Sequence, residues 1–185
     1  EDEIDIEDLI DEEDCVYTLT HNGYIKRLPT AEYRAQGRGG KGVKAMATRE
    51  EDYVETVFTA STHDNILFFT NLGKVYVRKG YRIPEAGRAA RGQNIVNIIP
   101  TDPGEKVSAM IAGRGISEDS YLVFVTRSGT VKRTAQSAFR NIRSNGIRAL
   151  SLDEGDELIT VLQTSGEDKI LLATHDGMAI CFNET

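Results

Sequence analysis

The most distinctive chemistry in the sequence belongs to a basic, glycine-rich heptapeptide. It consists of Gln36, Gly37, Arg38, Gly39, Gly40, Lys41 and Gly42. The pattern formally fits the dinucleotide-binding motif G-x-G-x-x-G, but no apolar strand precedes it and no helical pattern follows it. It is not a Walker loop, because Lys41 is followed by glycine rather than Ser or Thr. Two readings remain: a flexible backbone that brings two cations and main-chain N–H groups against phosphates, or a plain glycine turn between strands.

No arrangement of nucleophile, acid and base in the sequence indicates catalysis. His21, His63 and His175 stand in turn-like sites with no recurring Ser, Cys or carboxylate around them, so we interpret them as surface turn residues. Cys15 and Cys181 are too far apart for a metal-ligand motif and are interpreted as small core residues. The seven tyrosines lie in or beside expected strands, which indicates packing. We therefore predict no catalytic residue, no metal and no cofactor in this chain.

Charges are segregated along the chain. The 185 residues carry a net charge of −7, yet residues 15–148 hold 21 Lys and Arg against 11 Asp and Glu. Residues 1–14 hold ten carboxylates and no base, and we interpret them as a solvated acidic linker or tail. Residues 149–185 hold eight acids and one base. A polyanion is therefore attracted to the middle of a chain whose total charge predicts repulsion.

Four segments align on a glycine and predict repeated β-hairpins. They are residues 15–27, 65–78, 121–133 and 169–182, aligned on Gly23, Gly73, Gly129 and Gly177 with a threonine three residues before each glycine. Each reads as a strand rich in β-forming residues, a tight turn and a second strand. The glycines are 50, 56 and 48 residues apart, which leaves room for about two more strands in each unit. Acidic turns lead into these further strands at 50–58, 104–111 and 155–162.

This period predicts an all-β, propeller-like fold of four-stranded blades, each about 50 residues long. No window shows a sustained helical period, so helix should be scarce. Residues 15–185 should form one domain, an incomplete wheel of about three blades plus one hairpin. The acidic clusters at 50–52 and 153–157 recur with the blade period, which favours structural turns over a metal site.

Basic residues recur in the opposite phase of the repeat and define a predicted DNA-binding rim. Six bases fall within each of the ranges 26–44, 74–91 and 127–148, with at most one acid in each range. A curved belt of cations with few clustered aromatic rings suits the phosphates of duplex DNA better than single-stranded bases. Besides the heptapeptide, the predicted rim consists of Lys26, Arg27, Lys44, Lys74, Arg78, Lys79, Arg82, Arg88, Arg91, Arg127, Lys132, Arg133, Arg140, Arg143 and Arg148.

The sequence resembles the C-terminal domain of the DNA gyrase A subunit. The likeness rests on QGRGGKG, EEDYVETVF, STHDNILFFTNLGKVY and TSGEDKILLAT. The first of these is similar to the family's gyrase A box, with Gly37 where arginine is common. The resemblance implies a six-bladed β-pinwheel in which neighbouring blades exchange strands. It also implies sequence-independent wrapping of duplex DNA around the basic rim, which lets gyrase introduce negative supercoils with ATP.

The same resemblance implies which partners the chain has and where the catalytic groups of the whole enzyme lie. The partners would be duplex DNA, the remainder of gyrase's A polypeptide and its B polypeptide, in an A2B2 heterotetramer. The family's catalytic tyrosine lies in its N-terminal region, and ATP and Mg²⁺ are used elsewhere in the whole enzyme. Because the chain begins at Glu1 rather than Met, we expect a fragment of a longer protein.

The sequence also bears on the cellular location, and it leaves two alternative functions open. No apolar run reaches the roughly 18 residues of a membrane span, so we expect no membrane contact and a cytoplasmic, bacterial protein. One alternative is the paralogous subunit of topoisomerase IV, whose box is usually degenerate. The other is a Kelch-like propeller that binds proteins, which also has blades near 50 residues but has no need of a basic glycine-rich loop.

Overall fold

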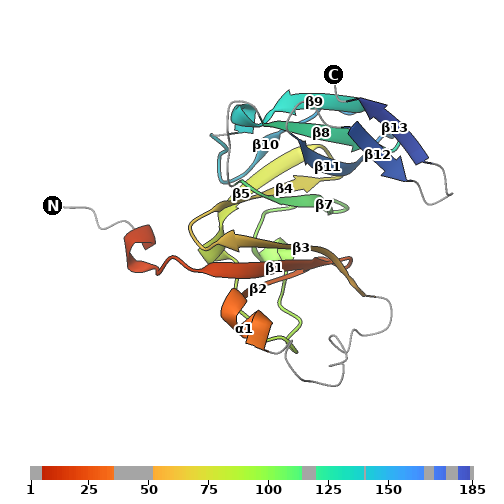
Figure 1. Ribbon diagram of the computed structural model, residues 1–185. Coiled ribbons are helices and arrows are strands. Elements are labelled where there is room, and N and C mark those ends of the chain that lie inside the picture. Colours follow the sequence, from red (N-terminus) through yellow and green to blue (C-terminus); the bar gives the residue numbers. More distant parts are fainter. Residues whose placement is uncertain are drawn as a thin grey trace.

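The structure is a computed structural model that describes residues 6–35, 52–113, 120–139, 141–164, 169–173 and 179–183. Antiparallel β-sheets follow one another along the chain and pack face to face (Figure 1). Helix within these residues is confined to short segments: α1 (Thr30–Ala35) and the 3-10 turns η1 (Ile6–Leu9), η2 (Gly80–Arg82), η3 (Ile95–Asn97) and η4 (Gln136–Phe139). The prediction of an all-β fold with little helix is confirmed.

The first sheet combines the first hairpin with two strands from later in the chain. Its order is β3-β1-β2-β6, where the strands are β1 (Asp14–Thr20), β2 (Tyr24–Pro29), β3 (Val54–Ser61) and β6 (Gln93–Asn94). All its pairs are antiparallel, and β1 lies between β2 and β3. Apolar residues of β1 are buried, as expected for a strand covered by a neighbouring sheet.

The second sheet repeats this arrangement and shows how blades are joined. Its order is β10-β5-β4-β7, where the strands are β4 (Asn65–Thr70), β5 (Lys74–Lys79), β7 (Val107–Ala112) and β10 (Ile147–Arg148). In both sheets the two-residue outer strand, β6 or β10, comes from the unit that follows in sequence. Neighbouring blades therefore exchange strands, as the resemblance implies.

The third sheet and a further hairpin complete the described strands. The third sheet has the order β11-β8-β9, with β8 (Tyr121–Thr126), β9 (Val131–Ala135) and β11 (Leu158–Thr164). The hairpin pairs β12 (Lys169–Ala173) with β13 (Ala179–Asn183). Among the described residues, no strand pairs with the outer edge of β9. The four predicted hairpins and the prediction of three blades plus one hairpin are confirmed.

The hairpin turns at Gly23 and Gly129 are each held by an acidic turn from the same unit. Gly23, Gly73 and Gly129 have φ angles of +87°, +79° and +90°, the left-handed region that glycine adopts readily. In the first blade, the Asp52 carboxylate accepts the backbone N–H of Asn22 at 3.0 Å. In the third, the Asp156 carboxylate accepts the N–H of Ser128 at 3.0 Å. Asp52 and Asp156 therefore belong to structural turns, as the repeat predicts, while Glu50 and Glu51 lie outside the described residues.

Two other glycines make the strand exchange possible. Gly92 has a φ of +90°, and a Cβ atom there would lie 2.4 Å from the carbonyl oxygen of Ile25. Gly146 has a φ of +80°, and a Cβ atom there would lie 2.8 Å from the Tyr76 ring. A side chain at either site would push the exchanged segment away from the blade that receives it.

The core lies between consecutive sheets. One buried cluster joins the first and second sheets through Tyr17, Phe68 and Tyr76, and a second joins the second and third sheets through Phe69 and Phe124. Such aromatic side chains supply much of the apolar area that a small blade can bury. Cys15 is fully buried in the first cluster, which confirms its prediction as a core residue, and burial raises the pKa of its thiol. The side chain of Cys181 lies outside the described residues.

Candidate nucleic-acid interface

The structure describes the surroundings of most predicted rim residues, but some of them lie outside the described residues. The heptapeptide 36–42, Lys44 and Arg140 lie outside the described residues. The remaining rim bases divide into three groups, according to whether their side chains are buried in hydrogen bonds, partly engaged, or exposed to solvent. This division decides which of them are available to a ligand.

Lys26 and Arg27 on β2 do not face solvent, contrary to the prediction. Lys26 is only 8% exposed, and its ammonium donates to the carbonyl oxygens of Gly87, Arg88 and Ala90 at 2.8–3.1 Å. Burial and the nearby Arg88 charge lower the pKa of Lys26. The β5–β6 loop of the second unit folds over β2, so both bases are used to hold that loop in place.

Arg27 is engaged in the same way. Its Nε donates to the carbonyl oxygen of Ile83 at 2.7 Å, and its guanidinium lies 3.6 Å from Glu85 and 3.9 Å from Glu13. Its side chain is 14% exposed. A group that already satisfies its donors within the protein has little left to offer a phosphate.

A second group of bases is partly engaged. Arg78 donates to the carbonyl oxygens of Val77 and Ile98, and burial lowers its pKa. Lys74 pairs with Asp102 at 3.0 Å, and this hydrogen bond raises the pKa of Lys74. Lys79 donates to the carbonyl oxygen of His63 at 3.2 Å and remains 35% exposed.

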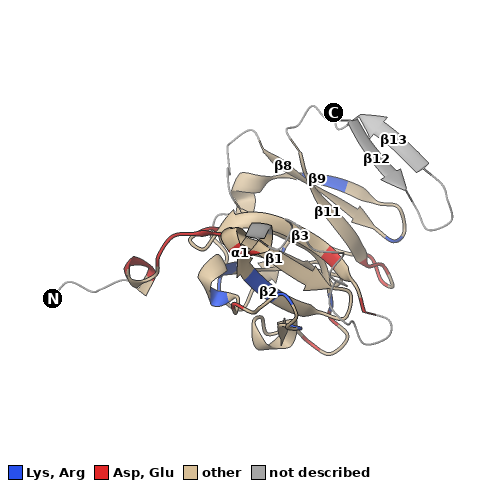
Figure 2. Ribbon diagram, turned by 60° about the horizontal axis from the view of Figure 1, so that its bottom comes forward, with Lys and Arg blue, Asp and Glu red and all other residues tan. Residues whose placement is uncertain are grey.

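The third group is exposed. It comprises Arg82, Arg91, Arg127, Lys132, Arg133, Arg143 and Arg148, while Arg88 is half-buried. Arg127 is paired with Glu157 at 2.5 Å in a largely exposed contact, which contributes little stability and yields readily to another anion. Figure 2 shows basic positions on β2 and β9, and acidic positions on the N-terminal segment and in loops at the strand ends.

Some of these guanidinium groups lie over tyrosine rings. The Arg91 guanidinium carbon is 3.6 Å from the centre of the Tyr24 ring, and that of Arg133 is 4.5 Å from the Tyr121 ring. A cation stacked on a ring has already lost conformational freedom, which lowers the entropic cost of a further contact. From the sequence, the tyrosines are expected only to be packing residues. Tyr24 and Arg91 are far apart in the chain, so no local pattern connects them.

Several of the bases surround a basic groove beside β5. The groove consists of two adjoining hollows of about 740 Å³ and 640 Å³ that share Asn65, Val77 and Ile142. Its basic lining residues are Arg78, Lys79, Arg82 and Arg143, and no Asp or Glu is among the described residues that line it.

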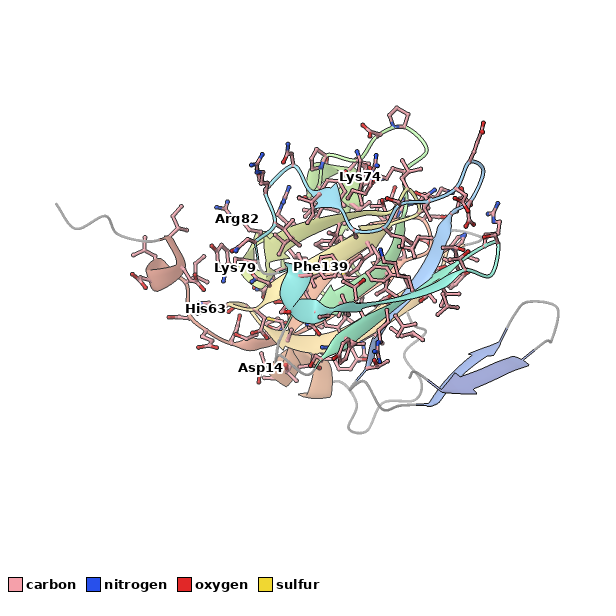
Figure 3. All side chains as sticks on the ribbon, turned by 90° about the horizontal axis from the view of Figure 1, so that it is seen from above. Asp14, His63, Lys74, Lys79, Arg82 and Phe139 are labelled. Atoms are coloured by element: carbon pink, nitrogen blue, oxygen red, sulfur yellow. The ribbon has the colours of Figure 1, made fainter. Side chains whose placement is uncertain are left out.

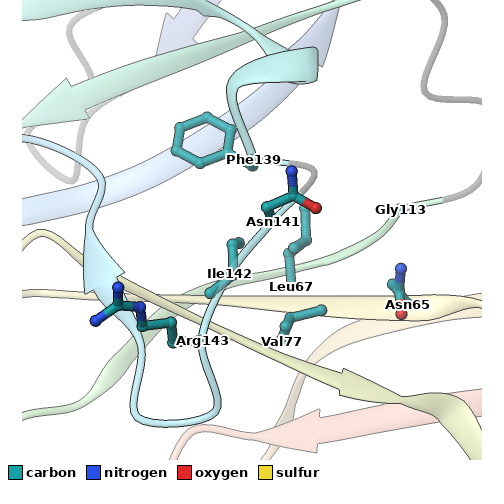
Figure 4. Close-up of a pocket in the computed structure, with 8 residues that line it drawn as sticks. All are labelled: Asn65, Leu67, Val77, Gly113, Phe139, Asn141, Ile142 and Arg143. Carbon is teal, nitrogen blue, oxygen red and sulfur yellow. The ribbon is translucent and has the colours of Figure 1, made fainter.

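The groove has an apolar floor and cations around it. Figure 4 shows Leu67, Val77, Phe139 and Ile142 gathered in the larger hollow, with Arg143 on the side opposite Asn65. Figure 3 shows Lys79 and Arg82 on the same side of the molecule as His63. An open surface with one sign of charge concentrates ligands of the opposite sign.

The histidines are more engaged than the sequence indicates. His21 Nδ1 lies 2.6 Å from the Glu55 carboxylate, and its ring stacks on Tyr53. His63 lies 2.8 Å from the carbonyl oxygen of Ile10. His175 lies outside the described residues. Within the part of the chain that the structure describes, no group of three or more His, Cys, Asp or Glu residues is placed to hold a metal ion. No helix in that part is long and apolar enough to cross a membrane.

Comparisons with known proteins agree with this architecture. The sequence matches the family "DNA gyrase C-terminal domain, beta-propeller" over residues 16–61, 64–113 and 120–165. It is 52% identical over 184 residues to the DNA gyrase A subunit of Clostridium acetobutylicum, covering the whole chain and 22% of that protein. It is 52% identical over 178 residues to the same gyrase subunit of Neisseria gonorrhoeae, covering 96% of the chain and 19% of that protein. The chain thus spans about a fifth of the relatives that it matches.

Solved structures give the same fold. The C-terminal domain of DNA topoisomerase IV superposes with a TM-score of 0.78 at 29% identity, covering 95% of this chain and 53% of that one. The DNA gyrase A C-terminal domain superposes with a TM-score of 0.67 at 27% identity, covering 92% and 55%. With the exchanged strands and the family match over three blades, these likenesses show that the chain belongs to the family of DNA gyrase A C-terminal β-propeller domains.

Proposed function

We propose that this chain binds duplex DNA without sequence preference through its exposed and partly engaged bases. The observation that carries the proposal is the basic groove, whose lining offers Arg78, Lys79, Arg82 and Arg143 without a single described carboxylate. Contacts from Arg and Lys to phosphates are independent of sequence and supply most of the affinity of non-specific binding. The name of the family, DNA gyrase, supports the choice of DNA as the polyanion.

We further propose that the duplex bends around successive blades. Exposed bases occur in the second and third units, at Arg82 and Arg91 and again at Arg133, Arg143 and Arg148. Bending 20–30 base pairs by 40–90° costs about 1–6 kcal/mol, so a bent path needs phosphate contacts spread along it. Cations on consecutive blades are suited to provide them, and the heptapeptide 36–42 would add contacts in the first unit.

In the whole enzyme this bending would support negative supercoiling with ATP. We propose that the chain works as part of gyrase's A polypeptide, together with the B polypeptide, in an A2B2 assembly in the bacterial cytoplasm. ATP and Mg²⁺ would be used by other parts of that enzyme, and the chain itself would contribute no catalytic residue. A role in topoisomerase IV is a second candidate because of the TM-score of 0.78. Identities of 52% to gyrase relatives favour gyrase.

A salt titration of DNA binding tests the proposal. If the chain contacts Z phosphates, the logarithm of the binding constant should fall with the logarithm of salt concentration with a slope of about −0.9Z. Arg82→Gln with Arg143→Gln should make this slope about two units shallower. Lys106→Gln is the matched control, because Lys106 is an exposed base in an acidic turn away from the groove lining. Absence of binding at low salt, or binding that does not respond to salt, would reject the proposal.

A further inference from the structure

Residues 10–13 of the acidic N-terminal segment are docked on the turn between the first and second sheets. Residues 10–13 run beside the turn at 61–64, which joins β3 to β4. Thr62 is the centre of this contact: its N–H donates to the carbonyl oxygen of Glu13 at 2.9 Å, and its hydroxyl donates to that of Asp11 at 3.0 Å. The N–H of Glu13 donates back to the Thr62 hydroxyl at 3.2 Å. We call residues 10–13 the anchor.

Side chains strengthen the anchor. The Ser61 hydroxyl donates to the Glu12 carboxylate at 3.0 Å. His63 Nε2 lies 2.8 Å from the carbonyl oxygen of Ile10, a contact in which the ring N–H is the donor. Backbone and side-chain hydrogen bonds together fix the direction in which the preceding residues leave the blade.

The residues before the anchor are held mainly by charge. In η1 (Ile6–Leu9) no residue is buried, and the apolar side chains of Ile6 and Leu9 are 55% and 73% exposed. The Glu7 carboxylate lies 3.4 Å from the Lys79 ammonium and 3.9 Å from His63 Nδ1. Lys79 is a lining residue of the basic groove. The η1 turn, held in place by the anchor, therefore presents the Glu7 carboxylate to a cation of the groove.

We propose that η1 is an internal competitor of DNA, which occupies the Lys79 end of the basic groove through Glu7 until a phosphate displaces it. This inference rests on the proposed function, because the displacing anion is a phosphate of duplex DNA. Both anions need the same ammonium group. The anchor, which makes its hydrogen bonds to the turn and not to the groove, stays in place when η1 leaves. The segment thus remains close enough to return when the duplex dissociates.

A matched pair of charge substitutions tests the competition. Glu7→Gln removes the carboxylate that faces Lys79, whereas Asp8→Asn removes one negative charge from the exposed side of the same turn. Measured on the 185-residue chain with a 40-base-pair duplex in 50 mM salt, Glu7→Gln should tighten binding about 2–5-fold, the range of an exposed ion pair. Asp8→Asn should tighten it by less than about 1.5-fold. The difference should shrink at 300 mM salt, where screening weakens both effects.

Hydrogen–deuterium exchange supplies a second measurement. On addition of the duplex, the amides of residues 6–10 should exchange faster, since the Ile10 N–H donates to the Glu7 carbonyl oxygen in η1, while the Glu13 amide, which donates to Thr62, remains protected. In the absence of DNA, Glu7→Gln should accelerate exchange of residues 6–10 on its own.

The outcomes separate this inference from the proposed function. If the wild-type chain binds the duplex but Glu7→Gln and Asp8→Asn have equal effects, the competition is rejected and DNA binding stands. Unchanged protection of residues 6–10 at saturating DNA also rejects it. If neither the wild-type chain nor Glu7→Gln binds the duplex, the proposed function fails and this inference fails with it.

Discussion

The same Lys-Arg pair occurs in the first and third blades and has opposite surroundings in the two. Lys26-Arg27 and Lys132-Arg133 both begin three residues after the hairpin glycine, on β2 and β9. Lys26 is 8% exposed and bonded to three carbonyl oxygens, whereas Lys132 and Arg133 are exposed. The difference arises because β6 and the loop before it cover β2, while no described strand covers β9. Position in the repeat therefore does not determine whether a base is available to a ligand.

The largest effect is expected at the heptapeptide. In the first blade, Lys26 and Arg27 hold the β5–β6 loop. Phosphate contacts in that unit must then come from other bases, and Arg38 and Lys41 are the two bases of the heptapeptide. We expect Arg38→Ala with Lys41→Ala, placed in the full-length protein and assembled into intact gyrase, to abolish ATP-driven negative supercoiling. Relaxation of supercoiled DNA and DNA cleavage should continue, because we propose that other parts of the enzyme carry out their chemistry. Gel assays of plasmid DNA measure all three activities.

The double variant also tests the alternative that residues 36–42 are a plain glycine turn between strands. Simple DNA affinity should weaken only modestly, since two cations are a small share of the basic residues. A double variant that supercoils at the wild-type rate would mean that residues 36–42 are only a glycine turn.

The buried lysine should matter for stability rather than for DNA binding. Lys26→Met keeps the apolar stem but leaves the carbonyl oxygens of Gly87, Arg88 and Ala90 without their donor, so we expect the free energy of unfolding to fall by about 1–3 kcal/mol. Lys132→Met, the equivalent change in the third blade, should stay within about 0.5 kcal/mol of wild type. Urea unfolding followed by circular dichroism measures both. Equal losses would show that the two lysines have the same surroundings in solution.

The exposed pair should show the opposite behaviour. Lys132→Gln with Arg133→Gln should make the salt dependence of DNA binding shallower by about two units, if each side chain contacts one phosphate. Unfolding in urea should hardly change, because neither side chain is buried. An unchanged slope would place β9 outside the DNA path, even though its bases are exposed.

Much of the fold follows from local sequence patterns. The hairpins at Gly23, Gly73 and Gly129 were predictable because turn chemistry and strand propensity act over a few residues. The exchanged strands β6 and β10 were not predictable as strands, because two residues are too short to show an alternating pattern. The strand exchange itself came only from the resemblance to a family.

The role of each base was much harder to predict than the fold. Lys26 finds its carbonyl partners 61–64 positions later in the chain, and Thr62 holds Asp11 across 51 positions. Hydrogen bonds of this kind depend on tertiary packing, so the pattern of charges alone places Lys26 and Arg27 on the rim and the acidic segment in solvent. The sequence shows that bases gather in one phase of the repeat. It could not indicate which of them the protein uses for its own loops.

The first and third blades share an aspartate whose carboxylate accepts the N–H groups of the hairpin turn. Replacing this aspartate should have the smallest effect of the changes considered. The Ser128 hydroxyl, together with backbone N–H groups of Ser128 and Glu157, lowers the pKa of Asp156 to about 2. In the first blade burial opposes the shift, but the N–H groups of Asn22 and Tyr53 hold the pKa of Asp52 below its ordinary value. In both turns, therefore, the aspartate is ionised when it accepts the hairpin N–H groups. This holds although the Lys-Arg pair is largely buried in the first blade and exposed in the third.

A carboxyl group with a lowered pKa stabilises the folded state only while it is ionised. The contribution of Asp156 should be complete above its unfolded pKa of about 3.9 and should be lost as the pH falls from about 4 towards 2. We expect Asp156→Asn to lower the urea midpoint at pH 6 slightly and to flatten its decline between pH 4 and pH 2.5. Asp153→Asn, in the same turn, is the control and should leave the decline unchanged. Parallel declines in wild type and Asp156→Asn would show that the carboxylate of the third blade does not hold its hairpin, and would make the first and third blades differ here as well.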